Sequence, residues 1–294
     1  MRKYLIFRTD RVGDFLFTLK IIKIIKSNNQ NSEITVVGSE YNQEYIKSFS
    51  GIDKIFTLQN NFFSKVKLIF FLRKEKYDSV IVHDGKKRSK FISFFLKYEK
   101  KTICVTDLIN TQIDIIKKAC DEINLKFDNS CIDFLDNRDY KSKIIPFKSY
   151  VHLHFDEKWI FNDYIKKYNS IEPNLQELIN FINNILIKNK KLIITTGKKT
   201  PKIINEIKKK FDNSKVRFYE NQKLTEIENI VINSELLISC HGWISHIASA
   251  KKIRQIDIIE SSYPYNKWTS HFRNYYSLNR EPFENLSKKI LGII

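Results

Sequence analysis

Short apolar runs alternate with longer amphipathic segments along the chain, and one polar stretch interrupts this pattern. Before the interruption, apolar runs predict strands at 3–7, 33–38, 54–58, 79–82 and 101–105. The segments between them predict helices at 15–26, 41–49, 63–74 and 107–127. Strands that alternate with helices at this spacing indicate βαβ units, and therefore a mainly parallel sheet.

The interruption spans 128–149, is polar and contains Pro146, and it predicts a linker. The alternation then restarts, with strands expected at 150–153, 191–196, 215–219, 236–238 and 255–259. Further helices are expected at 174–188, 200–211, 225–233, 244–250 and 283–291. The fold class is therefore α/β, and the chain's 294 residues suit two doubly wound, Rossmann-like domains. The predicted domains are 1–148 and 149–280, followed by a C-terminal helix at 281–294.

The apolar run at 236–238 ends in a turn that holds Cys240, His241 and Gly242. The helix expected after it is small and apolar apart from the imidazole of His246. A glycine turn between a strand and a helix points backbone N–H groups beyond the sheet edge, where an anion such as phosphate binds well. The same pattern is typical of turns that merely connect two elements, and a structural role for His246 fits equally well.

Asp14 directly follows Gly13 at the exit of the first predicted strand. Gly13 would permit a tight turn there. One interpretation of Asp14 is a helix cap, worth about 1 kcal/mol, and the other is a general base. The local pattern by itself favours the cap. Arg8 and Arg11 flank the turn and would either neutralise an anionic ligand or be solvated.

Other polar residues follow predicted strands of the second half. An ammonium at Lys158 could meet a phosphate as a point charge, although a lone lysine more often faces solvent. Thr225 and Glu228 predict a capping box without a catalytic role. The polar and aromatic loop at 260–268 could close over a ligand or form ordinary surface. Doubly wound sheets bind ligands outside the carboxyl ends of their strands. The shared position of these residues at strand ends is therefore a stronger argument for a ligand site than any one of them alone.

The net charge of +18 predicts attraction to polyanions such as nucleic acid, an anionic lipid surface or phosphorylated substrates. A general enrichment in Lys, Asn and Ile is an equally good explanation of that charge. The aromatic residues lie mostly in apolar runs rather than interleaved with lysines on one stripe, and this argues against nucleic acid.

Cysteine and histidine spacing gives little sign of a metal or cofactor site. No C-x-x-C spacing occurs, which predicts free thiols in a reducing cytoplasm for Cys104, Cys120, Cys131 and Cys240. His152 and His154 lack partners at metal-binding spacing, so we expect neither a metal nor a cofactor. No run of about eighteen apolar residues predicts a transmembrane helix, and the opening segment predicts a strand rather than a signal peptide.

Three segments carry a family pattern. In FRTDRVGDFLFTLKII an arginine and a short turn precede Gly-Asp, and in HLHFDEKWIFNDY a lysine precedes a tryptophan. LTEIENIVINSELLISCHGWISHIASA contains a glycine turn before a Ser-His-containing helix. Together they resemble glycosyltransferase family 9, the heptosyltransferase-like enzymes of the GT-B fold, over nearly the full length. Cys240 and His241 replace the family's usual aspartate and small hydroxyl residue, and the glycine-to-histidine spacing is one residue longer, so the donor sugar stays open.

The resemblance implies two domains facing each other across a cleft that holds the active site. Asp14 would be the base that deprotonates the acceptor hydroxyl. The implied donor-binding and phosphate-binding residues are Lys158, His241, Gly242, Ser245, His246 and Glu260. The implied residues of the acceptor side or the cleft are Arg8, Arg11 and Gly13.

The expected function is transfer of a sugar from a nucleotide-sugar donor to a glycan or glycolipid acceptor in cell-surface polysaccharide or lipopolysaccharide synthesis. The resemblance implies inverting, metal-independent chemistry with no cofactor beyond the nucleotide-sugar co-substrate. We expect a cytoplasmic protein at the inner face of the membrane, with peripheral contact to anionic lipid and no nucleic-acid partner. The alternatives are a nucleotide-sugar epimerase of GT-B shape and a non-catalytic basic module that binds nucleic acid or anionic membrane.

Overall fold

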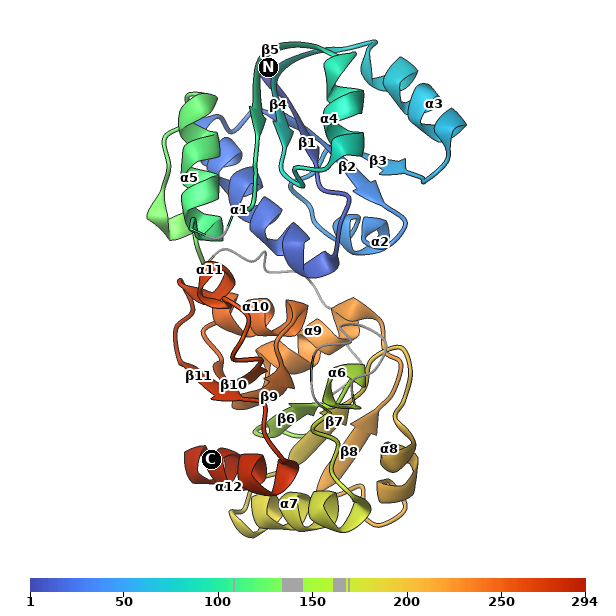
Figure 1. The fold of residues 1–294 in the computed structure, drawn as a ribbon, viewed down its shortest axis with the longest axis vertical. Coiled ribbons are helices and arrows are strands. Elements are labelled where there is room, and N and C mark those ends of the chain that lie inside the picture. Colours follow the sequence, from blue (N-terminus) through green and yellow to red (C-terminus); the bar gives the residue numbers. More distant parts are fainter. Residues whose placement is uncertain (108, 134–144, 161–167, 169) are drawn as a thin grey trace. The chain divides into compact units, whose positions relative to one another are not determined.

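A computed structural model describes residues 1–107, 109–133, 145–160, 168 and 170–294 (Figure 1). The chain divides into two compact units, and each is described by itself. Unit 1 comprises Met1–Arg138 and Asn266–His271, and unit 2 comprises Asp139–Tyr265 and Phe272–Ile294. Each unit is built on a parallel sheet, so the prediction of two doubly wound α/β units is confirmed.

The sheet of unit 1 has five parallel strands in the order β3-β2-β1-β4-β5. Their bounds are β1 (Lys3–Phe7), β2 (Glu33–Ser39), β3 (Lys54–Leu58), β4 (Lys76–Val82) and β5 (Lys97–Ile103). The central strand β1 pairs with β2 and β4, with Leu5 opposite both Thr35 and Val80. After its first residue β1 is buried throughout, as expected for a parallel strand covered by helices on both faces.

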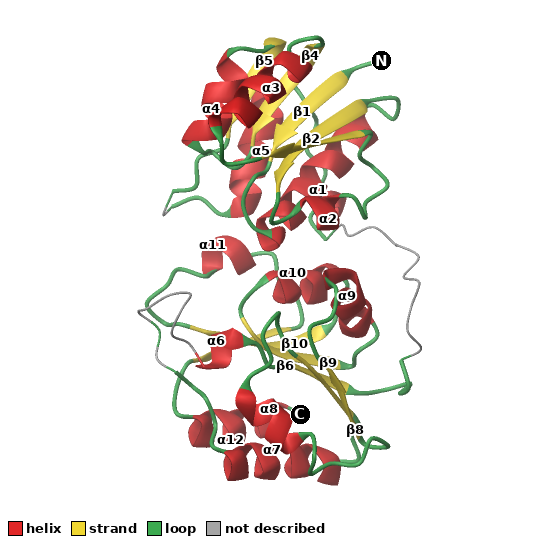
Figure 2. Cartoon of the chain, turned by 90° about the vertical axis from the view of Figure 1, so that its right-hand side faces the viewer, coloured by secondary structure: helices red, strands yellow, loops and turns green. Residues whose placement is uncertain are grey.

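Helices cover both faces of this sheet (Figure 2). They are α1 (Val12–Asn28), α2 (Gln43–Ile46), α3 (Phe62–Leu72), α4 (Lys87–Phe94) and α5 (Gln112–Glu122). Unit 1 also contains a 3-10 helix η1 (Asn129–Cys131) and α11 (Asn266–Thr269). One face is covered by α3 and α4, whose Leu68, Leu72 and Ile92 share a buried cluster with Leu5 and Val80 of the strands. The long helix α1 is buried on most of its positions, which confirms the expectation of apolar residues on most of its faces.

The sheet of unit 2 has six parallel strands in the order β11-β10-β9-β6-β7-β8. Their bounds are β6 (Val151–His154), β7 (Leu192–Thr195), β8 (Val216–Tyr219), β9 (Leu236–Cys240), β10 (Arg254–Ile259) and β11 (Tyr275–Asn279). The central strand β9 pairs with β6 and β10, so Ile238 lies opposite Leu153 and Ile256. All five residues of β9 are buried.

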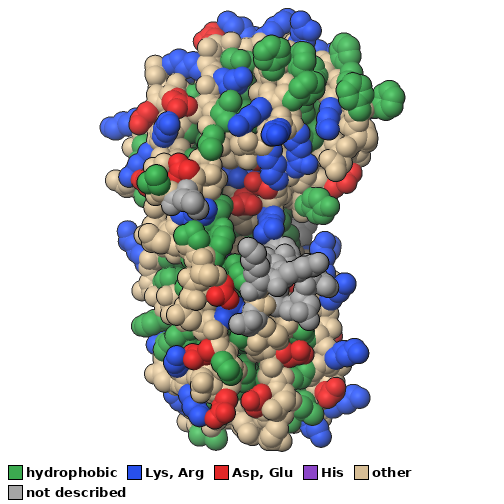
Figure 3. Space-filling view, viewed as in Figure 1, with side chains coloured by type: hydrophobic (Ala, Val, Ile, Leu, Met, Phe, Trp, Pro, Cys, Tyr) green, Lys and Arg blue, Asp and Glu red, His purple; other side chains and the backbone are tan. Residues whose placement is uncertain are grey.

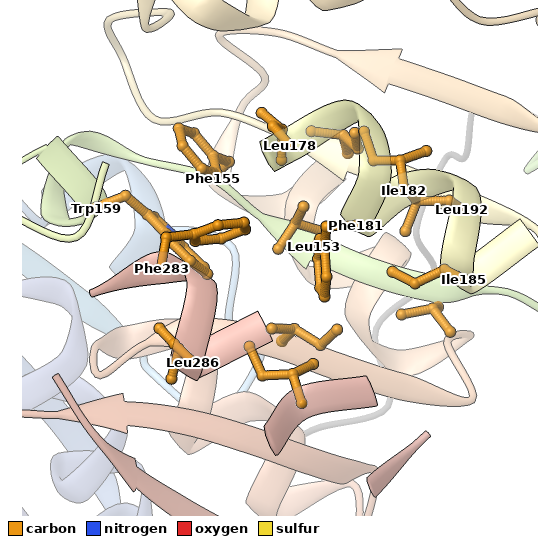
Figure 4. Packing of buried hydrophobic residues seen from close by; sticks show 14 of the residues in the cluster. Leu153, Phe155, Trp159, Leu178, Phe181, Ile182, Ile185, Leu192, Phe283 and Leu286 are labelled. Atoms are coloured by element: carbon orange, nitrogen blue, oxygen red, sulfur yellow. The ribbon is translucent and has the colours of Figure 1, made fainter. Parts of the chain in front are cut away.

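The helices of unit 2 are α6 (Glu157–Ile160), α7 (Leu175–Ile187), α8 (Lys202–Ile207), α9 (Leu224–Ile232), α10 (Trp243–Ala250) and α12 (Phe283–Ile293). Of these, α6, α7, α8 and α12 contribute to one large hydrophobic core against the sheet (Figure 4). The last helix inserts Phe283 into this core, where its ring meets Trp159 at 6.3 Å and Phe181 at 5.5 Å between centroids. The predicted C-terminal helix is therefore present and packs on unit 2.

Several predicted element positions differ from the structure. The expected helix at 107–127 is shortened to α5, and residue 108 lies outside the described residues. The expected linker at 128–149 contains η1, and 134–144 lie outside the described residues. Neither α4 nor β11 was predicted, because KRSKFISF and YYSLN lack a clear helical or strand periodicity.

The predicted capping box of α9 is wrong. This helix begins at Leu224, and Glu226 accepts a hydrogen bond from the backbone N–H of Lys223 at 3.0 Å. Glu228, the expected partner of Thr225, is instead fully buried.

Among the described residues, every helix is too short or too polar to cross a bilayer.

Candidate functional site

The candidate residues of both units lie where the order of the strands reverses. In unit 1 the chain builds β2 and β3 on one side of β1 and then crosses to β4 on the other side. In unit 2 it builds β7 and β8 on one side of β6 and then returns to β9 on the other. Ligands of doubly wound sheets bind outside the carboxyl ends of the strands at such switch points. Each unit therefore has one place where a ligand site is expected.

At the switch point of unit 2, Lys158 approaches the backbone of Gly242. A Cβ atom built on this glycine would lie 2.5 Å from Nζ of Lys158. Gly242 has an extended φ of 179°, so a glycine is needed here for space rather than for its backbone freedom. Gly242 is the N-cap of α10 and has no side chain of its own to cap the helix, while its backbone N–H lies 3.4 Å from Oγ of Ser245. The ammonium and the positive end of the helix dipole consequently lie together.

Lys158 belongs to a buried ion pair. Its Nζ lies 2.9 Å from Oδ2 of Asp156, and the two side chains are 16% and 5% exposed. Burial would raise the pKa of Asp156, but the Lys158 ammonium and the His154 ring hold that pKa below its usual value. Burial would lower the pKa of Lys158, and the carboxylate of Asp156 more than reverses this, so the lysine is charged at neutral pH.

The ammonium keeps donor capacity for an anion. Besides Asp156, Nζ donates to the backbone carbonyl of His241 at 3.3 Å. Within the part of the chain that the structure describes, these two are its only hydrogen-bond acceptors. Because an ammonium has three N–H bonds, one stays available for a phosphate oxygen.

His241 makes a contact that the sequence did not predict. Its Nδ1 lies 2.6 Å from Oδ2 of Asp257, a fully buried residue of β10. The same carboxylate accepts from Oγ of Ser245 at 2.8 Å and from the hydroxyl of Tyr275 at 3.2 Å. A carboxylate on one ring nitrogen fixes the orientation of the imidazole. The hydroxyl of Ser245, which the resemblance assigned to the donor diphosphate, is fully buried and donates to Asp257.

His246 and Glu260 complete the candidate residues of unit 2. His246 is half-buried on α10, and its ring meets those of His241 and Phe272 edge-on at 5.5 and 5.2 Å. Glu260 directly follows β10, and its carbonyl accepts from the backbone N–H of Tyr263 at 3.1 Å. Lys158 and Glu260 therefore follow the two strands that flank β9, on either side of Gly242.

At the switch point of unit 1, Arg8 is only 4% exposed, so the alternative of a solvated arginine is wrong. Its Nε donates to Oγ1 of Thr18 at 2.9 Å, and its guanidinium pairs with Asp10 at 3.0 Å. The hydroxyl of Thr18 also lies 2.8 Å from Nδ1 of His83, at the end of β4. Burial, with the nearby Arg8 charge, lowers the pKa of His83 well below its ordinary value. Arg8, which follows β1, is thus linked through the hydroxyl of Thr18 to His83, which follows β4.

Asp14 lies half-buried in the first turn of α1. Burial and the neighbouring Asp10 carboxylate raise its pKa above the ordinary value, although Arg8, the backbone of Arg11 and the charge of Arg11 act in the other direction. The backbone hydrogen bond from Arg11, the N-cap residue, shows that the capping interpretation is partly correct. A carboxylate with a raised pKa is also a stronger base, so both interpretations of Asp14 are compatible.

The other two candidates of unit 1 are placed differently from the prediction. Gly13 lies inside α1, which begins at Val12, so the expected tight turn at this glycine is wrong. Arg11 is exposed at the start of the same helix.

The sequence analysis missed two carboxylates. Asp84 follows β4, and its Oδ2 accepts from the backbone N–H of Thr9 at 3.2 Å and from the hydroxyls of Thr9 and Ser89 at 2.6 and 2.7 Å. It joins the two sides of the unit 1 switch point, as Asp257 joins β10 to His241. The signal for Asp257 was a charged residue between the isoleucines of IDII.

The remaining histidine pair and the cysteines are internal. Nε2 of His152 and Nδ1 of His154 each lie 2.7 Å from Oγ1 of Thr195. All four cysteines are free and buried, and burial raises the pKa of Cys240 to about 12. In the described ranges, no group of three or more His, Cys, Asp or Glu side chains could hold a metal ion.

No protein-family model and no curated protein sequence matches this chain, but solved structures resemble it over its whole length. An E. coli heptosyltransferase, WaaC with ADP-2-deoxy-2-fluoro heptose, is 11% identical with a TM-score of 0.72, over 99% of both chains. A glycosyl transferase family 9 structure from Veillonella parvula is 12% identical with a TM-score of 0.72, over 100% of this chain and 93% of that one. The chain has the GT-B fold.

The GT-B fold also occurs in enzymes of another class. A UDP-GlcNAc 2-epimerase from Methanocaldococcus jannaschii is 12% identical, with a lower TM-score of 0.57 over 100% of this chain and 92% of that one. The resemblance to glycosyltransferase family 9 is thus confirmed at the level of the fold. At these identities the comparison concerns the fold alone.

Proposed function

We propose that this chain is a glycosyltransferase that takes a sugar from a nucleotide-sugar donor. The observation that carries the proposal is the Lys158 ammonium beside Gly242, at the switch point of unit 2. The GT-B fold supports it, because the structures that resemble this chain include heptosyltransferases with ADP and with an ADP-sugar analogue. The acceptor would be a glycan or glycolipid of cell-surface polysaccharide or lipopolysaccharide synthesis.

Unit 2 would hold the diphosphate of the donor. The available N–H of Lys158 and the N-terminus of α10 offer positive charge to the phosphate oxygens. These groups are fixed before the ligand arrives, since Lys158 is held by Asp156 and by the carbonyl of His241. Preorganised charge of this kind stabilises a leaving diphosphate without reorganisation during the reaction. We propose for this reason that the chemistry is metal-independent.

Unit 1 would supply the base. In an inverting displacement the acceptor oxygen bonds to the anomeric carbon while the bond from that carbon to the phosphate oxygen breaks. The electron pair of the broken bond leaves with the nucleoside diphosphate, and the hydroxyl proton passes to the carboxylate of Asp14. Its raised pKa suits this role, because a base that is too weak contributes little.

A nucleotide-sugar epimerase is the second candidate, since such enzymes share the GT-B fold. An epimerase would convert a nucleotide sugar without an acceptor, whereas a transferase would release nucleoside diphosphate only when an acceptor is present. Measuring release with and without acceptor therefore separates the two. The proposed location of the transferase is the cytoplasmic side of the membrane, where lipid-linked acceptors are available.

The first test is a thermal-shift screen of the full chain against nucleoside diphosphates and their sugars. A ligand that binds the folded protein at about 100 times its dissociation constant adds roughly 2.7 kcal/mol of stability. We expect one nucleotide base to give this shift and Lys158→Met to abolish it. Lys209→Met, at an exposed lysine of the same unit, is the matched control. No shift with any nucleotide, or an unchanged shift in Lys158→Met, would refute the donor site.

A further inference from the structure

Unit 1 exposes an unusual number of aromatic rings on two neighbouring helices. The exposed phenylalanines of α3, α4 and the residue after α4 are Phe62, Phe63, Phe70, Phe71, Phe91, Phe94 and Phe95. The most exposed are Phe63 at 84%, Phe94 at 74% and Phe70 at 69%. Single exposed apolar residues are normal on a protein surface, but a contiguous group of this size marks a binding surface.

The core does not need these rings. On the inner sides of the helices, Leu68, Leu72 and Ile92 already fill the contact with the sheet. Both helices cover the same face of that sheet, so their outer sides form one surface, where Figure 3 shows hydrophobic side chains gathered among lysines and arginines. We call the seven phenylalanines with Lys67, Lys74 and Lys87 the aromatic-basic face.

Aromatic and basic residues alternate along this face at helical spacing. On α3 one stripe runs Phe63, Lys67, Phe70 and then Lys74 just past the helix end, in steps of three and four residues that fall on one side of a helix. On α4 a similar stripe runs through Lys87, Phe91 and Phe94. The sequence analysis had expected no such interleaving, and for α3 and α4 that expectation is wrong.

The charge of the face has a single sign. Residues 62–74 and 86–97 together contain nine lysines and arginines and no aspartate or glutamate. Two of the lysines lie over an aromatic ring, with Nζ of Lys67 and of Lys74 at 5.9 and 5.3 Å from the ring centroid of Phe71. A charged group over an exposed ring combines positive charge and apolar surface in one place, as at a boundary between water and hydrocarbon.

We propose that the aromatic-basic face docks unit 1 on an anionic lipid bilayer. Phenylalanine rings enter the boundary between headgroups and acyl chains, while lysines attract anionic headgroups. A second copy of this chain is a poorer occupant, because each copy would bring the same positive face and a net charge of +18.

A single-stranded nucleic acid is also a poorer fit. Bases stack on open ring faces, whereas Phe91 and Phe94 each meet Phe95 edge-on, at 5.1 and 5.4 Å, and Phe62 meets Phe63 at 6.2 Å. Aromatic rings clustered against one another suit an apolar medium better. The inference concerns a surface of unit 1 alone and does not rest on the proposed transferase activity.

The test is co-sedimentation of the full chain with vesicles of phosphatidylcholine, with and without about one third phosphatidylglycerol. We expect binding to the anionic vesicles that weakens with added salt, and little binding to phosphatidylcholine alone. The triple variant Phe63→Ser, Phe70→Ser and Phe94→Ser should bind at least about tenfold more weakly and keep its melting temperature, because these rings are exposed.

Matched controls separate the face from general properties of the chain. Tyr41→Ser with Ile187→Ser removes two exposed apolar side chains elsewhere and should leave vesicle binding unchanged. Lys67→Gln, Lys74→Gln and Lys87→Gln should weaken binding at least about tenfold. The same charge change at exposed lysines of unit 2, in Lys202→Gln, Lys209→Gln and Lys210→Gln, should have a smaller effect.

Three outcomes would overturn the proposal. The first is unchanged vesicle binding in the phenylalanine variant. The second is equal binding to both kinds of vesicle. The third is no vesicle binding together with a dimer or a complex with single-stranded nucleic acid that the phenylalanine variant loses. Because vesicle binding needs no donor or acceptor, failure here would leave the proposed transferase activity untouched.

Discussion

The strand-to-helix turns at the two switch points differ in length and in charge: four residues separate β1 from α1, and two separate β9 from α10. In unit 1 the turn after β1 places Asp14 in the first turn of α1, where burial and Asp10 raise its pKa. In unit 2 the turn after β9 places Gly242 at the start of α10, beside a lysine whose pKa Asp156 raises. One turn thus favours taking up a proton, and the other favours holding an anion.

The difference in charge arises from the side chains that lie beside each turn. Arg8 in unit 1 is already paired with Asp10, so it only partly offsets the repulsion between Asp10 and Asp14. Lys158 in unit 2 has a single buried carboxylate partner and keeps one donor for a ligand. A doubly wound sheet therefore specifies where a ligand binds, and the residues that follow adjacent strands specify which charge it meets.

Substitution of Asp14 is the most direct test of the difference between the two turns. We expect Asp14→Asn to lose about 10²–10⁴ in turnover, because the amide cannot accept the acceptor proton. The variant should unfold no more easily than the wild type, since the charged carboxylate is disfavoured where it lies. Turnover and urea denaturation measure the two effects. Glu44→Gln, at an exposed carboxylate of unit 1, is the control, and near-normal transfer by Asp14→Asn would remove the base assignment.

In unit 2 the comparable change is Lys158→Met. It leaves Asp156 buried without a cation, which typically costs about 3–5 kcal/mol of stability. The double variant Asp156→Asn with Lys158→Met should recover most of that stability but not the affinity for nucleoside diphosphate. Denaturation and calorimetric titration distinguish the effects. Recovery of binding in the double variant would show that Lys158 acts on structure alone.

A smaller change sharpens the role of Gly242. In Gly242→Ala the new methyl group must displace the Lys158 ammonium, and we expect about a tenfold loss of nucleotide affinity, or about 1.4 kcal/mol. The extended backbone accepts alanine, so the fold should persist. Gly292→Ala, where a Cβ would meet nothing within 4 Å, serves as the control. Equal affinities in the two variants would argue against phosphate binding at this turn.

The two carboxylates should also differ in their dependence on pH. Asp156 has a lowered pKa, so its stabilising effect is present above the unfolded value of 3.8 and is lost as the pH falls below it. Asp14 has a raised pKa, so its destabilising effect grows as the pH rises above 3.8. Urea unfolding of the wild type, Asp156→Asn and Asp14→Asn across this range should show opposite trends. Parallel trends would contradict the electrostatic contrast between the turns.

The sequence predicted strands well and side-chain partners poorly. Apolar runs such as Lys3–Phe7 mark buried parallel strands, and the observed β1 has those bounds. Lys158 and Gly242 could be placed at strand ends because both follow such runs. Their contact could not be predicted, since it depends on β9 returning beside β6 after two strands on the other side.

Buried polar partners were the hardest to foresee. Arg8 gave no sign that it would be buried, because its partner Thr18 lies on the next helix and Thr18 in turn contacts His83, which is distant in the sequence. The link between His241 and Asp257 needs β10 beside β9. The exposure of the phenylalanines of α3 was equally difficult to predict from the sequence. An apolar run such as LIFFL indicates buried residues, and only the packing of the helix shows which of them are exposed.

The short segment Asn266–His271 has a consequence for how the molecule is made. These residues come late in translation, yet they belong to the compact body formed by the first 138. There Trp268 and His271 lie against Phe17, at 5.7 Å between ring centroids. A ribosome-bound N-terminal half therefore lacks two of the neighbours of Phe17 until most of the second half has been synthesised. Cutting the gene at the middle of the chain would leave Trp268 and His271 on a different piece from Phe17.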